Sequence, residues 1–479
     1  YLRRSEFDKA LKAIDVLAKK QPDSPLAPSL RGQALLAKKD VAGARKNFEQ
    51  ALKVSPVYFP AAAILARLDM AEKKPDDARK RFESVLAADP KNTPALLAIA
   101  ELKAATGGTP DEVIALVKKA VQANPTDVTP RQRLIDLYLR SKDTKQAVSA
   151  AQDAVAAIPD NAGLLDAQGR AQQAAGDTQQ AISTYNRIVA LQPNSPLGHL
   201  RIAAIHAMAK NPDAALQSLQ RALEIKPDLL DAQRGLITLY LEGNRLQEAL
   251  AVAKKVQKQR PTEAIGYVFE GDIYASRKSW AEAIAAFRAG LKALPASGEL
   301  AVKLSNALRA NQQSDEAEKF VGSWFKQYPK DPAFLFYMGD LAIARKEYDK
   351  AAGYYRTVVD AQPNNAMALN NLAWATGQSK GAKAIEYAEM ANRLAPNQPA
   401  FMDTLAVLLA EKGDHVHARQ LLEQALKLQP QAAPIRLNLA KVLIKAGDKG
   451  AARKELDELA KLGDKFAGQA EVAQLLKSL

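Results

Sequence analysis

Small and apolar residues recur along this chain with a period of about 34 residues. At one position of the period, thirteen of fourteen residues are alanine and the other is Val113. The alanine column is Ala10, Ala44, Ala78, Ala147, Ala181, Ala215, Ala249, Ala283, Ala317, Ala351, Ala384, Ala418 and Ala452. A small side chain is needed where two helices cross closely. A fixed period of this length predicts an array of helix-turn-helix units.

Prolines keep the same register, twelve residues after each alanine. They are Pro22, Pro56, Pro90, Pro125, Pro159, Pro193, Pro227, Pro261, Pro295, Pro329, Pro363, Pro396 and Pro430. Their spacing is 34 in ten cases, 35 once and 33 once. Because proline cannot continue a helix, each one is expected to end the second helix of its unit.

Two further columns describe the packing of the units. Eight residues before the proline lie Phe48, Phe82, Tyr185, Phe287 and Tyr355. Twenty-four residues before it lie Gly32, Gly169, Gly271 and Gly339. We expect the aromatic rings to fill the space between adjacent hairpins, and the glycines to let the first helix approach its neighbour.

The turns between the two helices carry their own signals. Gly176-Asp177, Gly413-Asp414 and Gly447-Asp448 suit a helix end followed by an N-cap. The 35-residue unit has an extended turn at 107–110, and the 33-residue unit departs from the period at 377–381. Both changes are expected to lie in a turn, where changes of length are tolerated.

The unit Gly32–Ala44–Phe48–Ala51–Pro56 resembles the tetratricopeptide repeat (TPR) consensus at all five positions. The resemblance implies an all-α, right-handed superhelical α-solenoid of about 13 repeats over residues 1–464. Tyr1 falls late in a first helix, so the first repeat is expected to be incomplete and its start to lie upstream. Residues 465–479 predict an amphipathic capping helix, which repeat arrays need to cover their last apolar face.

In this family the first helices line a concave groove that binds extended peptides or helices. Groove positions are expected two to four residues before and one after the glycine column. They include Asp166, Arg170, Arg234, Asp272, Asn306, Arg309, Phe336, Tyr337, Asp340, Asn370, Asn371, Trp374, Asp403, Asn438 and Lys441. One interpretation is a ligand groove centred on the aromatic residues of 336–374. The alternative, for any one residue, is packing between repeats.

Signals for other chemistry are weak. Lys303 and Asn306 approach the carboxylate clamp of some TPR domains, but Tyr337 stands where the clamp needs asparagine. His415 and His417 are two apart and therefore do not share a helix face, which makes them a poor metal pair. Phosphate-binding, dinucleotide-binding and zinc-protease motifs are missing from the sequence. We expect no enzyme activity, no cofactor and no metal.

The net charge and the absence of cysteine leave both the class of partner and the compartment open. The net charge of +14 attracts acidic partners in general, yet the sequence shows neither a block of five or six basic residues nor an aligned Lys/Arg row. The chain has no cysteine, which suits both cytoplasm and periplasm. No apolar run reaches the length of a membrane span.

A narrower resemblance covers the last three repeats. The strings that carry it are Asn370–Ala375, Ala384–Glu389, Leu394–Pro396, Asp403–Leu405, Leu421–Leu422, Ile435–Ala440 and Gly447–Lys449. They are similar to the C-terminal repeats of PrsT-type TPR lipoproteins of the PEP-CTERM/exosortase systems. That resemblance implies a periplasmic scaffold, anchored to the outer membrane by a lipid upstream, which binds polysaccharide synthase or export proteins.

Three alternatives stay open. The chain could be a cytoplasmic TPR adaptor, or the regulatory array of a larger assembly. The positively charged chain could bind nucleic acid. Helical-hairpin arrays that read RNA, however, have a 35-residue period and lack these alanine and proline columns. Its basic surface could also bind an anionic polysaccharide directly. Other proteins are the partners that we expect.

Overall fold

The computed structural model describes Tyr1 and residues 6–479, and within that part the chain contains helices and no strand. The helices are α1 (Phe7–Lys20), α2 (Leu26–Ala37), α3 (Val41–Val54), α4 (Phe59–Ala71), α5 (Pro75–Ala88), α6 (Thr93–Ala105), α7 (Pro110–Ala123), α8 (Val128–Arg140), α9 (Thr144–Ala157), α10 (Ala162–Ala175), α11 (Thr178–Leu191), α12 (Leu197–Met208), α13 (Pro212–Ile225), α14 (Leu230–Glu242), α15 (Leu246–Gln259), α16 (Ile265–Ser276), α17 (Trp280–Ala293), α18 (Gly298–Ala310), α19 (Ser314–Gln327), α20 (Pro332–Ala344), α21 (Tyr348–Ala361), α22 (Ala366–Gln378), α23 (Ala384–Leu394), α24 (Pro399–Glu411), α25 (His415–Leu428), α26 (Ala433–Lys445), α27 (Lys449–Ala460), the 3-10 helix η2 (Gly463–Lys465) and α28 (Gln469–Ser478). Residues 2–5, at the start of the expected incomplete repeat, lie outside the described residues.

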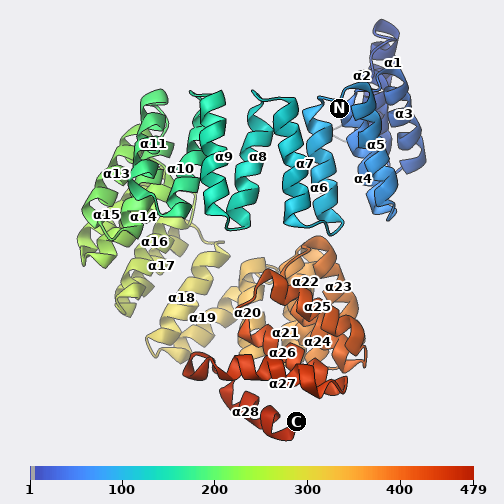
Figure 1. Cartoon of the computed structure of the whole chain (residues 1–479). Helices are drawn as coiled ribbons and strands as arrows, with labels where there is room; N and C mark the ends of the chain where they lie inside the picture. Colours follow the sequence, from blue (N-terminus) through green and yellow to red (C-terminus); the bar gives the residue numbers. More distant parts are fainter. Residues whose placement is uncertain (2–5) are drawn as a thin grey trace. The chain divides into compact units, whose positions relative to one another are not determined.

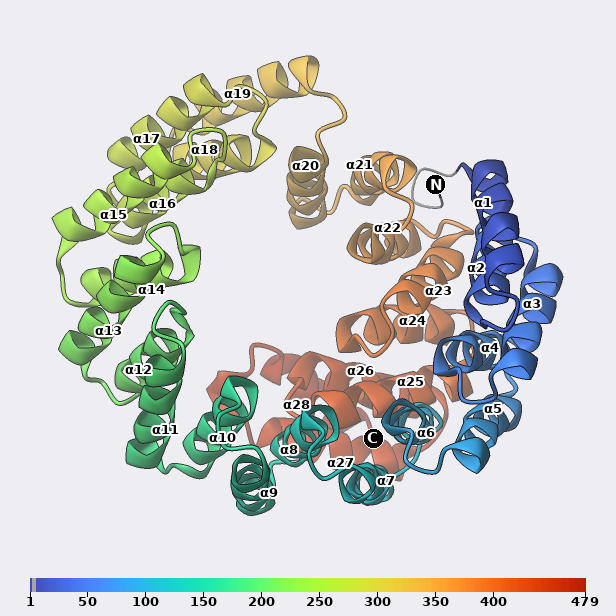
Figure 2. The same cartoon turned by 90° about the horizontal axis from the view of Figure 1, so that it is seen from above.

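The described chain forms two compact units, Tyr1–Leu239 and Tyr240–Leu479, with the boundary inside α14. Unit 1 holds α1 and the hairpins from α2/α3 to α12/α13, and unit 2 holds α15, the hairpins from α16/α17 to α26/α27, and α28. Within each unit every hairpin packs against the next one along the chain (Figure 1, Figure 2). This arrangement confirms the all-α hairpin array that the 34-residue period predicts.

The alanine column lies where the second helix of a hairpin meets the first. Ala44, Ala181 and Ala283 have no exposed surface, and Val113 is 7% exposed. The glycine and aromatic columns meet inside the same hairpin. A Cβ atom on Gly32 of α2 would lie 2.8 Å from Cζ of Phe48 in α3. The glycine therefore makes room for the ring of its own repeat.

Each turn between the first and second helix contains one residue with positive φ. Gly176, Gly413 and Gly447 adopt φ of +82° to +89°, as the Gly-Asp pairs predict. Asp414 and Asp448 accept hydrogen bonds from backbone amides at the start of the next helix. Asp177 was expected to do the same, but its side chain makes no capping hydrogen bond.

The two irregular units differ from each other. In the 35-residue unit the extra residue lies in the turn, as expected, and Thr109 with Glu112 caps a full 14-residue α7. In the 33-residue unit the missing residue also shortens the second helix. There α23 has 11 residues, whereas α21 and α25 have 14. The expectation that this change is confined to the turn was therefore wrong.

The C-terminal segment is helical, but its helix begins later than predicted. Residues 463–465 form η2, and α28 begins at Gln469 instead of 465. Val472 of α28 is 1% exposed and packs with Leu437, Leu456 and Leu459 of the last hairpin. In the described part of the chain, no helix has both the length and the apolar character needed to cross a bilayer.

Candidate binding surfaces on the first helices

All fifteen predicted groove residues lie on first helices, from α10 to α26. The structure divides them between the units, with Asp166, Arg170 and Arg234 in unit 1 and the others in unit 2. Their exposure also differs. Arg234, Asn306 and Asp340 are exposed, Tyr337 is buried, and the remaining eleven are partly buried. The prediction of the groove as a binding surface stays untested by this placement.

In unit 1 the predicted residues form a ladder of ion pairs between successive first helices. Arg170 Nη2 of α10 lies 3.0 Å from Asp136 Oδ1 of α8, and Arg170 Nε lies 3.3 Å from Asp166 Oδ2. Arg201 Nε of α12 lies 2.7 Å from Asp166 Oδ1. The partners are 34 and 35 residues apart, because equivalent positions of neighbouring repeats face each other. Each residue is partly exposed, so the pairs add little stability.

The ladder covers a buried phenol. Tyr185 has no exposed surface, and its hydroxyl has no hydrogen-bond partner in the described part of the chain. Burial, together with the nearby carboxylate of Asp166, raises the pKa of Tyr185 to about 12. The hydroxyl therefore stays neutral over the physiological range.

In unit 2 several predicted residues are bound by neighbours in the same unit. Lys303 Nζ donates to both oxygens of Asp272, at 2.8 and 2.7 Å. Tyr337 Oη lies 2.8 Å from Ser305 Oγ and accepts from Arg309 Nε at 3.3 Å. Asp340, in turn, accepts from Tyr355 Oη at 2.6 Å. These contacts join first helices to one another or to the second helix of the same hairpin.

The structure does not gather the aromatic residues of 336–374 into one patch. The ring of Phe336 packs edge-on against Tyr355, with centroids 5.8 Å apart. Tyr337 is buried beside Phe334, with centroids 5.7 Å apart. Trp374 lies instead in a hollow formed by later helices. Two of the three aromatic residues therefore serve the packing of α20.

We call the cavity beside Trp374 the Trp374 hollow. It has a volume of about 430 Å³ and lies between α22, α24, α26 and α28. Apolar side chains of Val407, Val442 and Leu475 line it beside Trp374. The predicted residues Asn438 and Lys441 belong to the same lining. The volume is within the range of ligand pockets, and the mixed lining could hold an apolar side chain with a polar end.

A hydrogen bond and an ion pair hold the side chains at the rim of the Trp374 hollow in place. Asn438 Nδ2 donates to Asp403 Oδ1 at 2.8 Å, and Lys441 Nζ lies 2.7 Å from Glu471 Oε1 of α28. Burial raises the pKa of the Asp403 carboxyl, against the opposing effects of Asn438 and Lys441. The structure thus brings together four predicted residues, Trp374, Asp403, Asn438 and Lys441, on consecutive first helices.

Glu471 and Leu475 are not among the predicted groove residues, because the sequence predicts a capping helix alone for residues 465–479. Continuing the register by one period puts the next glycine-column position at 474. Glu471 and Leu475 then fall three before and one after it, in the predicted groove columns. Helix α28 therefore occupies the place of one more first helix.

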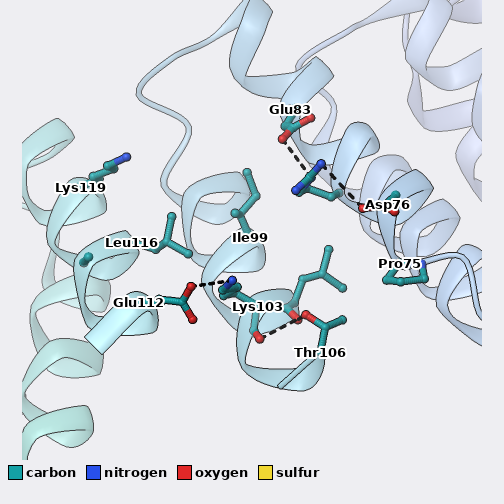
Figure 3. Close-up of a pocket in the computed structure, with 12 residues that line it drawn as sticks. Pro75, Asp76, Glu83, Ile99, Lys103, Thr106, Glu112, Leu116 and Lys119 are labelled. Atoms are coloured by element: carbon teal, nitrogen blue, oxygen red, sulfur yellow. Dashed lines mark hydrogen bonds and ion pairs between the residues drawn. The ribbon is translucent and has the colours of Figure 1, made fainter. Parts of the chain in front are cut away.

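A second cavity, of about 570 Å³, lies in unit 1 beside the 35-residue repeat, and we call it the Ile99 hollow. Ile99, Leu102 and Leu116 supply its apolar surface. Figure 3 shows the pair between Lys103 Nζ and Glu112 Oε1, 2.8 Å apart, at this hollow. Glu112 is exposed, and the hydrogen bond from Lys103 lowers its pKa. The sequence predicts only an extended turn in this 35-residue unit, and it gives no indication of a cavity.

A third cavity, of about 480 Å³, adjoins the shortened helix α23, and we call it the Gly381 hollow. It is lined by Gly377, Lys380, Gly381, Leu408 and Lys412, among others. Because α23 starts only at Ala384, the space that the first turn of this helix would occupy is open. Both irregular repeats therefore carry a hollow.

The histidines form no obvious site. His417 Nδ1 lies 2.7 Å from Asp414 Oδ2, and the His415 Nδ1 atom is buried without a hydrogen-bond partner in the described chain. Burial lowers the pKa of His199. The described residues contain no cluster of three or more His, Asp or Glu that could hold a metal ion.

Comparison with known proteins identifies the repeat. Two family models, each described as tetratricopeptide repeat, match residues 35–102, 206–266 and 409–479, and residues 1–59, 167–229, 302–366 and 338–399. The TPR repeat-containing protein PA4667 of Pseudomonas aeruginosa is 25% identical over 228 residues, covering 47% of this chain and 33% of that protein.

Cellulose synthase operon protein C is matched in two organisms. The Escherichia coli K12 protein is 25% identical over 379 residues, which cover 66% of this chain and 33% of that protein. The Xanthomonas axonopodis protein is 39% identical over 85 residues, 18% of this chain and 6% of that protein. The chain thus spans a third or less of the length of these three relatives.

Among solved structures, the Cut9–Hcn1 hetero-tetramer of the anaphase-promoting complex aligns with a TM-score of 0.39 at 13% identity, over 87% of this chain and 96% of that one. The matches of the repeat family together extend over most of the sequence. This chain belongs to the tetratricopeptide repeat family.

Proposed function

We propose that this chain is a non-catalytic scaffold that binds proteins of exopolysaccharide synthesis or export in the periplasm. The observation that carries the proposal is the match to cellulose synthase operon protein C over 66% of the chain. The strings of the last three repeats support the same setting, through their resemblance to PrsT-type lipoproteins. On that basis we propose an outer-membrane anchor upstream of Tyr1.

The binding surface that we propose is the Trp374 hollow and its rim. Four residues predicted from the repeat register come together there, and α28 completes the wall. The apolar lining can take a side chain from a partner helix or extended peptide, and the rim charges can orient its polar groups. TPR arrays bind segments of this kind on their first helices.

A site-specific crosslink tests the proposal. The full-length protein is expressed in its native cells with the photo-crosslinking residue p-benzoylphenylalanine at Trp374. The matched control carries the same residue at Lys427, which is exposed on second helix α25. We expect light-dependent crosslinks from position 374, and not from 427, to a polysaccharide synthase or export component. Crosslinks from 374 to cytosolic proteins alone would contradict the scaffold and favour a cytoplasmic TPR adaptor.

The compartment needs a separate measurement. The full-length protein is fused at its C-terminus to alkaline phosphatase, which is active only after export. We expect activity in intact cells and recovery of the fusion with the outer membrane. An inactive fusion that is fully soluble in the cytoplasm would rule out the periplasmic assignment.

A further inference from the structure

The hairpin turns carry a row of lysines in an unusual backbone conformation. Nine of the ten non-glycine residues with positive φ lie at one equivalent turn position. Seven of these are lysine: Lys39, Lys73, Lys142, Lys210, Lys278, Lys346 and Lys380, with φ between +56° and +65°. We call these seven residues the turn lysines. Each unit therefore carries lysines at this equivalent turn position, four in unit 1 and three in unit 2.

The backbone explains the conformation but not the residue type. The amide of Lys39 donates to Leu36 O at 2.9 Å, and that of Asp40 to Leu35 O at 2.9 Å. This pair of bonds is the Schellman motif, whose left-handed position favours glycine. Glycine does occupy it at Gly107, Gly176, Gly413 and Gly447. A cation near a helix C-terminus is favourable, but a neighbouring position would provide it without the strained φ.

The turn lysines are also unpaired. All seven are exposed, and none has a carboxylate partner within 4.0 Å in the described part of the chain. Adjacent lysines behave differently, since Lys38 pairs with Asp8 at 3.6 Å and Lys74 with Glu72 at 2.8 Å. Strained, exposed and unpaired charges at one repeated position indicate a function beyond folding.

In unit 2 a cavity lies on the same edge. Lys380 lines the Gly381 hollow, and Lys412 lines it from the next turn. The turn edge of unit 2, which we define by Lys278, Lys346, Lys380 and Lys412, therefore combines ammonium groups with a hollow of about 480 Å³. A cavity of this size can accept a small ring-shaped group.

We propose that the turn edge of unit 2 binds an acidic polysaccharide, whose carboxylates contact the turn lysines. Successive hairpins place their turns about 10 Å apart, so the positive charge is sparse. Nucleic acid carries far denser charge, at about one phosphate per 3.4 Å of each strand. Surfaces for single-stranded nucleic acid also add exposed aromatic stacking platforms, whereas the aromatic residues nearest to Lys278 and Lys346 in the chain, Trp280 and Tyr348, are partly buried at the first position of second helices. The choice of polysaccharide rests on the proposed function.

The test uses the full chain and two triple variants. The first is Lys278→Gly, Lys346→Gly and Lys380→Gly, which removes the charge and leaves the residue that the turn favours. The control is Lys292→Ala, Lys326→Ala and Lys427→Ala, three exposed lysines near the ends of second helices. Circular dichroism verifies that both remain helical. Affinity for alginate oligosaccharides is measured by calorimetry over a series of salt concentrations.

We expect the glycine variant to bind alginate roughly tenfold more weakly or worse, with a shallower salt dependence, and the control to bind like the natural chain. Equal losses in both variants, or no loss in the glycine variant, would overturn the proposal. Tighter lysine-dependent binding of a single-stranded RNA or of phosphatidylserine vesicles would reassign the edge to that ligand. The scaffold role is tested by crosslinking at position 374, and polysaccharide binding by the affinity for alginate. Either proposal can therefore fail without the other.

Discussion

At the scale of single residues, the repeat depends on contacts between columns. The glycine of the first helix and the ring of the second are a matched pair in four repeats, as in Gly32 with Phe48 and Gly271 with Phe287. The ring fills the space that any side chain at the glycine position would need. Neither residue can change alone without disturbing the hairpin.

Gly271→Ala tests this pairing. The new methyl group would collide with the ring of Phe287, which has 1% exposed surface and cannot move away. We expect a loss of about 1–3 kcal/mol, the usual cost of overpacking, seen as a lower thermal midpoint. Gly353→Ala is the matched control, because nothing lies within 4 Å of its Cβ position in α21. Alanine there should stabilise the helix by about 1 kcal/mol.

Asp403 gives a second prediction, on pH. Folding raises the pKa of its carboxyl, mainly through burial, so the folded chain holds the proton more tightly than the unfolded chain. The free energy of unfolding therefore falls as pH rises from the ordinary Asp pKa through the raised value. Asp403→Asn removes this dependence. We expect the thermal midpoint of the variant, relative to the natural chain, to be higher at pH 7 than at pH 4. A difference that is constant with pH would argue against a buried carboxylate.

At the scale of elements, every turn within a hairpin has the same backbone conformation, with one left-handed residue. Several residue types occupy that position, and lysine fills it more often than glycine. The sequence pattern identified the Gly-Asp turns and the turns of the two irregular units, but not the other lysine turns, because lysine is not a typical turn residue. Lys39 and Gly176 each lie five residues before the alanine column, but only the backbone shows that both adopt the same left-handed conformation, with φ of +65° and +88°.

Lys210→Gly measures the strain at one turn. Lys210 has φ of +56°, and glycine adopts this region without a Cβ clash. We expect a stabilisation of about 1 kcal/mol, observed as a higher thermal midpoint. The reciprocal change Gly176→Lys should lower the midpoint by a similar amount, since Gly176 holds the same position at +88°. Opposite signs in the two variants are the result to look for.

At the scale of the whole molecule, each unit is a stack in which hairpins contact their neighbours. Stability in such arrays is a sum of repeat and interface contributions, and unfolding can be local. A single midpoint therefore averages over regions of different stability. Measurements that resolve the chain by segment are better suited to this protein.

Phe48→Ala tests local unfolding. Phe48 is fully buried among Ala44, Ala61 and Leu65, and removal of such a ring costs about 3–5 kcal/mol. We expect hydrogen exchange to accelerate in α2 to α5 and to remain unchanged in α16 to α27. Uniform acceleration along the chain would show instead that the array unfolds as one cooperative body.

The sequence alone determined the period, the helical hairpins and the helices that bear the candidate site. Ala44, Phe48 and Pro56 act locally, through close helix crossing, core filling and helix ending, and the same local chemistry recurs in every unit. The register even locates Glu471 and Leu475, once α28 is treated as a further first helix.

The role of each groove position, in contrast, depends on how the hairpins pack together. Tyr337 and Lys303 occupy equivalent positions in their repeats, yet Tyr337 is buried and Lys303 pairs with Asp272. Trp374 and Asp340 are also equivalent, yet Trp374 lines a hollow and Asp340 accepts a hydrogen bond from Tyr355. Most of these outcomes depend on side chains about 34 residues away, which meet only when the hairpins stack. The unpaired turn lysines and the hollow left by the short α23 are decided in the same way, by backbone conformation and by the packing of neighbouring hairpins.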